Sequence, residues 1–190
     1  AGQLPQFYSV AQHSVLVASM VEPSLRLAAL LHDASEAYMG DLSRHLKHHE
    51  LLTGYRDLEE RLQCVILDTL RAGVTWSDYA QIKRADNAAA IFEHVTLRLG
   101  CELRQEHIDQ LLSVGFTDDS AEALAPFVAR LPHRTFGLHT SNIFNPLLPW
   151  SAPYARDKFI TCFDECIKAR KFAEWAYGCG PGTLAGDLDL

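Results

Sequence analysis

Apolar residues recur every three or four positions along most of the chain, a spacing that predicts helices. No stretch alternates apolar and polar residues between hairpin turns, and no internal repeat is visible. The expected helices cover residues 7–21, 23 or 24 to about 39, 55 to about 71, 75 to about 99, 106–113, 121–129 and 155 to about 177. We therefore expect an all-α fold, with one domain over residues 1–177 and a flexible tail over residues 178–190.

Several helix boundaries carry their own signals. Ser9 is a candidate N-cap for the first helix, and Thr75 and Asp78 have the spacing of a capping box. Gly40, Gly73 and Gly100 are expected to end helices. The predicted inner faces include Leu58, Leu62, Val65, Ile66 and Leu70 in one helix, Ile82, Ala85, Ala89 and Phe92 in the next, and Phe159, Cys162, Phe163, Cys166 and Ile167 in the last.

The second predicted helix is apolar around nearly its whole circumference, which is typical of a buried helix. Three ionisable residues, His32, Asp33 and Glu36, nevertheless lie within it. Burying such groups is costly unless they are paired or bind a metal. Glu36 lies four residues after His32 and is expected on the same helix face. Asp41 follows the terminating Gly40 and is expected at the mouth of the same site.

The composition and net charge limit the classes of binding partner that we expect. The chain has 190 residues, of which 48% are hydrophobic, and a formal net charge of −7 with no long basic run. This argues against binding duplex nucleic acid, but it allows a small anionic substrate held by a metal ion and a few cations. No apolar run approaches the roughly 20 residues that span a bilayer, and no signal peptide is visible, so we expect no membrane partner.

Five cysteines, at 64, 101, 162, 166 and 179, are odd in number and irregularly spaced. They are typical of reduced thiols in a cytoplasmic protein. The chain begins at Ala1 without a Met, which suggests that residues are missing upstream.

Four of the ionisable residues form a candidate metal-ligand set. His13, His32, Asp33 and Asp86 come from three predicted helices and supply two imidazoles and two carboxylates. Such a set suits Zn, Mn, Fe, Co or Ni and leaves room for one or two waters. Taken singly, each residue has a simpler interpretation, because a lone His is more often a core residue and Asp86 follows Lys83 and Arg84 as a surface ion-pair partner would.

The local contexts of these residues resemble a known family. Tyr8-Ser-Val-Ala-Gln-His13-Ser, Leu30-Leu-His-Asp-Ala-Ser-Glu36 with Gly40-Asp-Leu42, and Lys83-Arg-Ala-Asp86 resemble the HD-domain metal-dependent phosphohydrolases, in particular the 5′-deoxynucleotidase-like branch. The resemblance covers roughly residues 7–100 and, more loosely, the last helix. It implies an HD-domain helical bundle, a divalent Co, Mn, Zn or Fe ion on His13, His32, Asp33 and Asp86, and catalytic acids at Glu36 and Asp41. It also implies a homo-oligomer, a dimer or larger.

Other candidate residues each have two interpretations. Arg44 and Lys47 could neutralise a phosphate, with Asp41 on a sugar hydroxyl, or they could belong to a solvated charged turn. His45, His48 and His49 fit either a second metal or a solvated loop. Residues 131–153, with His133, Arg134, His139, Trp150 and Tyr154, are expected to form a long loop that covers the site, wraps the core or contacts another subunit.

The resemblance leaves the substrate open. The basic-aromatic segment that relatives carry well upstream of the first His has no counterpart here, because the chain begins twelve residues before His13. Dephosphorylation of deoxynucleoside monophosphates is the leading expectation. Release of triphosphate from deoxynucleoside triphosphates and nucleotide binding without turnover are the alternatives, and the presence of Glu36 and Asp41 argues against the last.

Overall fold

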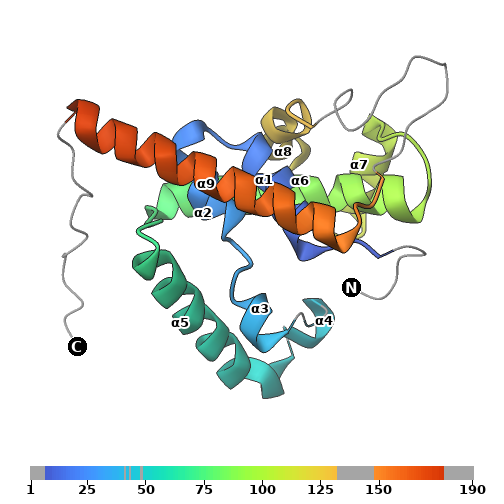
Figure 1. The fold of residues 1–190 in the computed structure, drawn as a ribbon. Coiled ribbons are helices and arrows are strands. Elements are labelled where there is room, and N and C mark those ends of the chain that lie inside the picture. Colours follow the sequence, from blue (N-terminus) through green and yellow to red (C-terminus); the bar gives the residue numbers. More distant parts are fainter. Residues whose placement is uncertain (1–6, 41, 43, 48, 132–147, 178–190) are drawn as a thin grey trace, which may run out of the picture.

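The computed structural model describes residues 7–40, 42, 44–47, 49–131 and 148–177, and every regular element among them is a helix (Figure 1). This agrees with the predicted all-α class. Predictions that concern residues 1–6, the tail over residues 178–190, Asp41, His48 and most of the long loop, with His133, Arg134 and His139, lie outside the described residues. The side chains of Arg44 and His45 also lie outside them.

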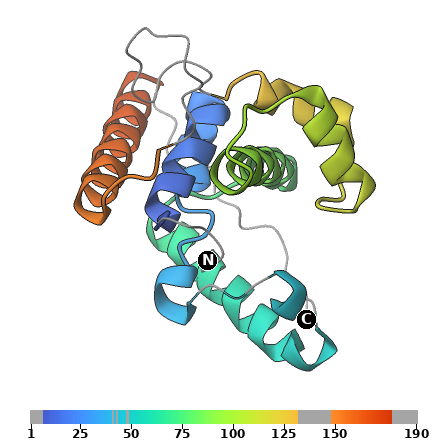
Figure 2. The same ribbon diagram turned by 90° about the vertical axis from the view of Figure 1, so that its right-hand side faces the viewer.

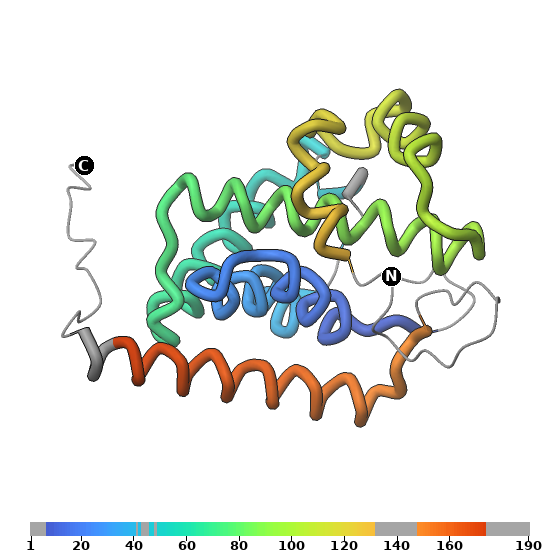
Figure 3. The backbone as a smooth tube through the Cα atoms, turned by 90° about the horizontal axis from the view of Figure 1, so that it is seen from above, coloured from blue at the N-terminus to red at the C-terminus, as the bar shows by residue number. Residues whose placement is uncertain are grey.

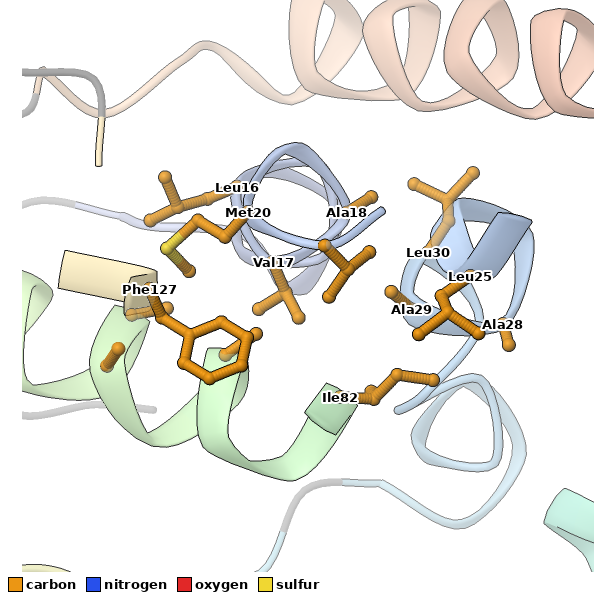
Figure 4. Packing of buried hydrophobic residues seen from close by; sticks show 14 of the residues in the cluster. Leu16, Val17, Ala18, Met20, Leu25, Ala28, Ala29, Leu30, Ile82 and Phe127 are labelled. Carbon is orange, nitrogen blue, oxygen red and sulfur yellow. The ribbon is translucent and has the colours of Figure 1, made fainter. Parts of the chain in front are cut away.

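The bundle is organised around α1 (Val10–Met20), α2 (Arg26–Leu30) and α6 (Trp76–Glu93). α1 packs against both α2 and α6, and α9 (Ala152–Tyr177) lies along α1 and α2. On the other side, α8 (Ala121–Val128) packs against α6, and α7 (Gln105–Ser113) packs against α8. Figure 3 shows α9 as a separate layer beside α1. The core between these helices is closed by Leu16, Met20, Leu30, Ile82 and Phe127, all at most 8% exposed (Figure 4).

Most of the predicted helix boundaries are confirmed within a few residues. Ser9 caps α1 by accepting a hydrogen bond from the Gln12 backbone N–H, and Thr75 and Asp78 form the capping box that starts α6. α6 continues directly into a π-helical turn over His94–Arg98, and Gly100 follows with a positive φ of 66°. The predicted inner residues of α6 and α9 all lie in or against the core.

The prediction of one continuous helix from residue 23 or 24 to about residue 39 was wrong. A 3-10 turn over Pro23–Leu25 leads into α2, which ends at Leu30, and residues 31–35 form turns before the short α3 (Glu36–Met39) begins. His32 Nδ1 donates to the Ala29 carbonyl at 2.8 Å, and a carbonyl bonded in this way is a poorer acceptor for the next helical N–H. His32 and Glu36 are therefore not on one face of a single helix. Gly40 does cap α3, at φ 78°.

α5 (Thr53–Thr69) projects away from the bundle and carries α3 and the short α4 (Arg44–Lys47) near its N-terminal end (Figures 1 and 2). A 3-10 turn over Glu50–Leu52 precedes it. The predicted apolar face was only partly right. No α5 residue is buried, and Leu58 and Val65 are 58% and 60% exposed, whereas Leu67 and Leu70 at its C-terminal end pack against the core.

Four cysteines lie among the described residues, and all four are free: Cys64, Cys101, Cys162 and Cys166. None of the described helices is long and apolar enough to cross a membrane.

Candidate metal centre

Three of the predicted ligands come together from three separate segments. His13 lies on α1, His32 follows α2 and Asp86 lies on α6, and one possible ligand atom from each lies within 4.8 Å of the others. His13 Nε2 is 3.1 Å from Asp86 Oδ1, and His32 Nε2 is 3.7 Å from the same oxygen. The packing of α1 against α2 and α6 therefore assembles the cluster.

Asp33 lies at the edge of this group. Its Oδ2 atom is 3.1 Å from His32 Nε2 and 3.8 Å from His13 Nε2. At 32% exposure the Asp33 side chain is the most accessible of the four, whereas His32 is 9% exposed and His13 is 13% exposed. The group that comes together is therefore His13, His32 and Asp86, and Asp33 lies beside it near solvent, so its place as a fourth ligand stays a prediction.

Hydrogen bonds on the far side of each imidazole set its orientation. His13 Nδ1 lies 2.8 Å from Glu93 Oε1, and the Tyr8 hydroxyl donates to the same oxygen at 2.7 Å. His32 Nδ1 donates to the Ala29 carbonyl. With Nδ1 of each ring bonded in this way, Nε2 is directed toward the cluster, which is the orientation that metal-binding histidines generally adopt.

The imidazoles and carboxylates of the cluster shift one another's pKa values. Burial by itself would lower the pKa of His13, but the carboxylates of Glu93 and Asp86 outweigh it and raise that pKa well above its usual value. Burial by itself would also lower the pKa of His32. The carboxylates of Asp33 and Asp86 outweigh burial and raise this pKa to about 9. Burial would raise the pKa of Asp86, but the two imidazoles hold it well below its usual value. Positive charge is therefore favoured at the centre of the cluster, supplied here by protons on the imidazoles.

The donor atoms fit a divalent ion. Two ligand atoms about 2.0–2.2 Å from one ion, at tetrahedral or octahedral angles, lie about 2.8–3.6 Å apart. The four imidazole–carboxylate distances, from 3.1 to 3.8 Å, come within a few tenths of an ångström of that range. His32 Nε2 is also buried and makes no well-directed hydrogen bond among the described residues, although Asp33 Oδ2 lies 3.1 Å away. A buried nitrogen of this kind requires a partner, and a metal ion would supply one.

Asp86 has a second partner that leaves one oxygen for the cluster. Lys83 Nζ donates to Asp86 Oδ2 at 2.6 Å, from the preceding turn of α6. The Lys83 side chain is 54% exposed, so its cation lies at the solvent-facing side of Asp86. A cation in this position is available to an anionic group that approaches the cluster.

The remaining predicted site residues form a second group near α3 to α5. Lys47 Nζ donates to Glu36 Oε1 at 3.1 Å and to Glu59 Oε1 at 2.8 Å. Lys47 therefore ties the first residue of α3 to α5, and its role as a phosphate ligand stays a prediction. His49 accepts from the Leu51 backbone N–H, so one ring nitrogen of this residue already serves as a cap.

The described end of the predicted long loop is attached to α1 beside the cluster. Gln12, which precedes His13 and is 1% exposed, donates from Nε2 to the Leu148 carbonyl and accepts at Oε1 from the Trp150 backbone N–H. The Trp150 ring then packs edge-on against Tyr154, with the ring centroids 5.3 Å apart. A covering role for this segment stays a prediction.

Two contacts made by or beside the cluster residues were not predicted from the sequence. Glu93 lies seven residues after Asp86, which is two helical turns, so its spacing places it on the same face of α6 as Asp86. This spacing is a sequence signal that connects the two residues. Gln63 contacts the turn that carries His32 and Asp33, and no spacing rule connects residues so far apart in the chain.

Comparison with known proteins finds relatives that are themselves described as uncharacterized. The chain is 47% identical over 66 residues to the protein YfdR of Escherichia coli (strain K12), which covers 35% of this chain and 36% of YfdR. It is 40% identical over 102 residues to the protein RCAP_rcc00048 of Rhodobacter capsulatus, which covers 50% of this chain and 49% of that protein. The chain thus spans half or less of the length of these relatives, and no protein-family model matches it.

Proposed function

We propose that this chain is a metal-dependent phosphohydrolase of the HD-domain type that acts on deoxynucleotides, most simply by removing the 5′ phosphate of deoxynucleoside monophosphates. The observation that supports this most directly is the convergence of His13, His32 and Asp86, with both Nε2 atoms directed at one point. The sequence contexts of these residues, which resemble the 5′-deoxynucleotidase-like branch, supply the substrate class.

In this proposal His13, His32, Asp33 and Asp86 hold the ion. A divalent Co, Mn, Zn or Fe ion bound there would activate water and polarise a phosphoryl oxygen. Glu93 and the Ala29 carbonyl keep the two imidazoles oriented through their Nδ1 atoms. Lys83, partly exposed beside Asp86, offers a cation to the substrate phosphate.

Glu36 is the proposed general base. It lies at the start of α3, immediately after the turn that carries His32 and Asp33, and Lys47 holds its carboxylate. Its role is to accept the proton of the attacking water, leaving an alcohol and inorganic phosphate as products. Asp41 and Arg44 stay proposed substrate contacts on the strength of the sequence resemblance.

The direct test is product analysis with the purified chain. Deoxynucleoside mono-, di- and triphosphates are incubated with Mn²⁺ or Co²⁺, and the products are separated by chromatography. The proposal expects inorganic phosphate from the monophosphates. Intact triphosphate released from triphosphates would instead assign the alternative reaction at the same site, and metal binding without turnover of any nucleotide would contradict the proposal.

Variants connect the activity to the cluster. His13→Ala and Asp86→Asn each remove a proposed ligand and are expected to lower phosphate release at least 100-fold. His107→Ala is the matched control, because this partly buried histidine lies on α7 and bonds Arg104 and Cys101. Equal activity of His13→Ala and His107→Ala would contradict the assignment of the centre.

A further inference from the structure

His32 and Asp33 are neighbours in sequence, yet both side chains reach the same point. Successive residues of an α-helix diverge by about 100° around its axis, so adjacent side chains on a regular helix do not face one ligand. The turns over residues 31–35 remove this restriction. They allow His32 Nε2 and Asp33 Oδ2 to approach within 3.1 Å of each other.

A side chain from α5 occupies the position where the helical hydrogen bond would form. In a continuous helix the Ser35 N–H would donate to the Leu31 carbonyl, four residues earlier. Here Gln63 takes both places. Its Nε2 donates to the Leu31 carbonyl at 2.6 Å, and its Oε1 accepts from the Ser35 N–H at 3.1 Å. The Gln63 amide is therefore inserted into the hydrogen-bond ladder of this segment, which is a recognised cause of helix interruption.

Only a side chain with a donor and an acceptor at its end satisfies both groups at once. Gln and Asn carry such an amide, and Gln is the longer of the two. Leu31 and Ser35 are each 4% exposed. The Leu31 carbonyl also accepts from the Ala34 N–H at 3.0 Å, so removal of Gln63 costs mainly the partner of the buried Ser35 N–H. When Gln63 is absent, closing the direct bond from Ser35 to Leu31 is the nearest way to satisfy this N–H.

We propose that Gln63 is a positioning residue for the metal centre. It keeps the helix open between Leu31 and Ser35, so that His32 and Asp33 both face the ion. Without it, the segment closes into a more regular helix and Asp33 rotates away from His32. This inference rests on the proposed metal centre, and it gives α5, which has no buried residue, a role in metal binding.

The test measures metal affinity independently of turnover. Gln63→Met keeps the side-chain length and removes both hydrogen bonds. Titration of the metal-free chain with Co²⁺, followed by calorimetry and by the visible absorption of the bound ion, is expected to show affinity about 10–100-fold weaker than that of the unaltered chain. The absorption spectrum is also expected to change, because loss of Asp33 alters the ligand set.

Two controls separate positioning from general destabilisation. Leu67→Ala loosens the packing of α5 on the core but leaves both Gln63 hydrogen bonds to the turn in place. Gln105→Met makes the same chemical change on α7, where Gln105 bonds Asp109. Both are expected to bind Co²⁺ as the unaltered chain does, even where Leu67→Ala lowers the melting temperature as much as Gln63→Met.

The outcomes are distinct. Unchanged Co²⁺ affinity and spectrum in Gln63→Met would overturn the inference while leaving the metal centre intact. An equal loss of affinity in Leu67→Ala and Gln63→Met would also overturn it, because the effect would then be general. Absence of Co²⁺ binding by the unaltered chain would instead contradict the proposed function itself.

Discussion

Replacing Tyr8 by Phe removes a single oxygen atom from the support of His13. The Tyr8 hydroxyl donates to Glu93 Oε1 at 2.7 Å, and the same oxygen lies 2.8 Å from His13 Nδ1. Burial, and then the nearby charge of Glu93, raises the pKa of Tyr8, so the hydroxyl stays a donor at every pH at which the protein is handled. The variant therefore tests one hydrogen bond to a partly buried carboxylate.

The expected magnitude follows from the charge on the acceptor. Hydrogen bonds to charged groups contribute about 1.5–3 kcal/mol to the free energy of unfolding. For a chain of this size, each kcal/mol shifts the melting temperature by about 2–4 °C. Tyr8→Phe is thus expected to lower the melting temperature by about 3–12 °C. It is also expected to weaken Co²⁺ binding several-fold, because Glu93 then holds His13 less firmly.

Thermal denaturation of the metal-free chain measures the melting temperature, and calorimetric titration with Co²⁺ measures the affinity for the ion. Tyr79→Phe is the matched control, since Tyr79 is 50% exposed and packs edge-on against the exposed Trp76. Exposed substitutions of this kind usually change stability by less than about 0.5 kcal/mol. If Tyr8→Phe behaved like Tyr79→Phe in both measurements, the proposed support of His13 through Glu93 would be refuted.

Three further predictions concern proton release on metal binding, the pH dependence of stability and the capping of α6. Because nearby carboxylates favour the protonated forms of His13 and His32, metal binding at pH 7 should release protons. Calorimetry in buffers of different ionisation enthalpy detects this release as a binding heat that depends on the buffer. A binding heat that is the same in every buffer would contradict the prediction. In the metal-free chain, the contribution of His32 is complete below about pH 6.5, its unfolded pKa, and is lost as the pH rises through about 9, so urea midpoints should fall over that interval. Thr75→Ala breaks the capping box of α6 and should cost about 0.5–2 kcal/mol in urea denaturation, whereas the exposed Thr69→Ala should cost less.

The interruption of the helix between Leu30 and Glu36 cannot be predicted from the apolar pattern of this segment. The apolar spacing from Leu27 to Ala37 is helical throughout, and residues 26–30 and 36–39 are indeed helices. The residues that open the helix are His32, which bonds the Ala29 carbonyl, and Gln63, which bonds Leu31 and Ser35. The first contact is local, but the second comes from another helix, so no periodicity in the segment itself reveals it.

The exposure of α5 has a similar explanation. Its apolar spacing predicts an inner face, and Leu67 and Leu70 do pack on the core. Leu58 and Val65 do not, because α5 leaves the bundle and its C-terminal end is the part that packs on the core (Figure 1). A hydrophobic pattern indicates which side of a helix is apolar, but it does not indicate how far along the helix a partner extends.

The sequence by itself determined the all-helical class, most helix boundaries and the identity of the clustered ionisable residues. These follow from local physics, since capping, glycine termination and the cost of burying charge depend on neighbours in the chain. Only the tertiary structure decided that His13, His32 and Asp86 meet, that Glu93 and Tyr8 support one imidazole, and that Gln63 holds the ligand turn open. Those contacts join residues far apart in the chain, and helix packing alone brings them within hydrogen-bonding distance.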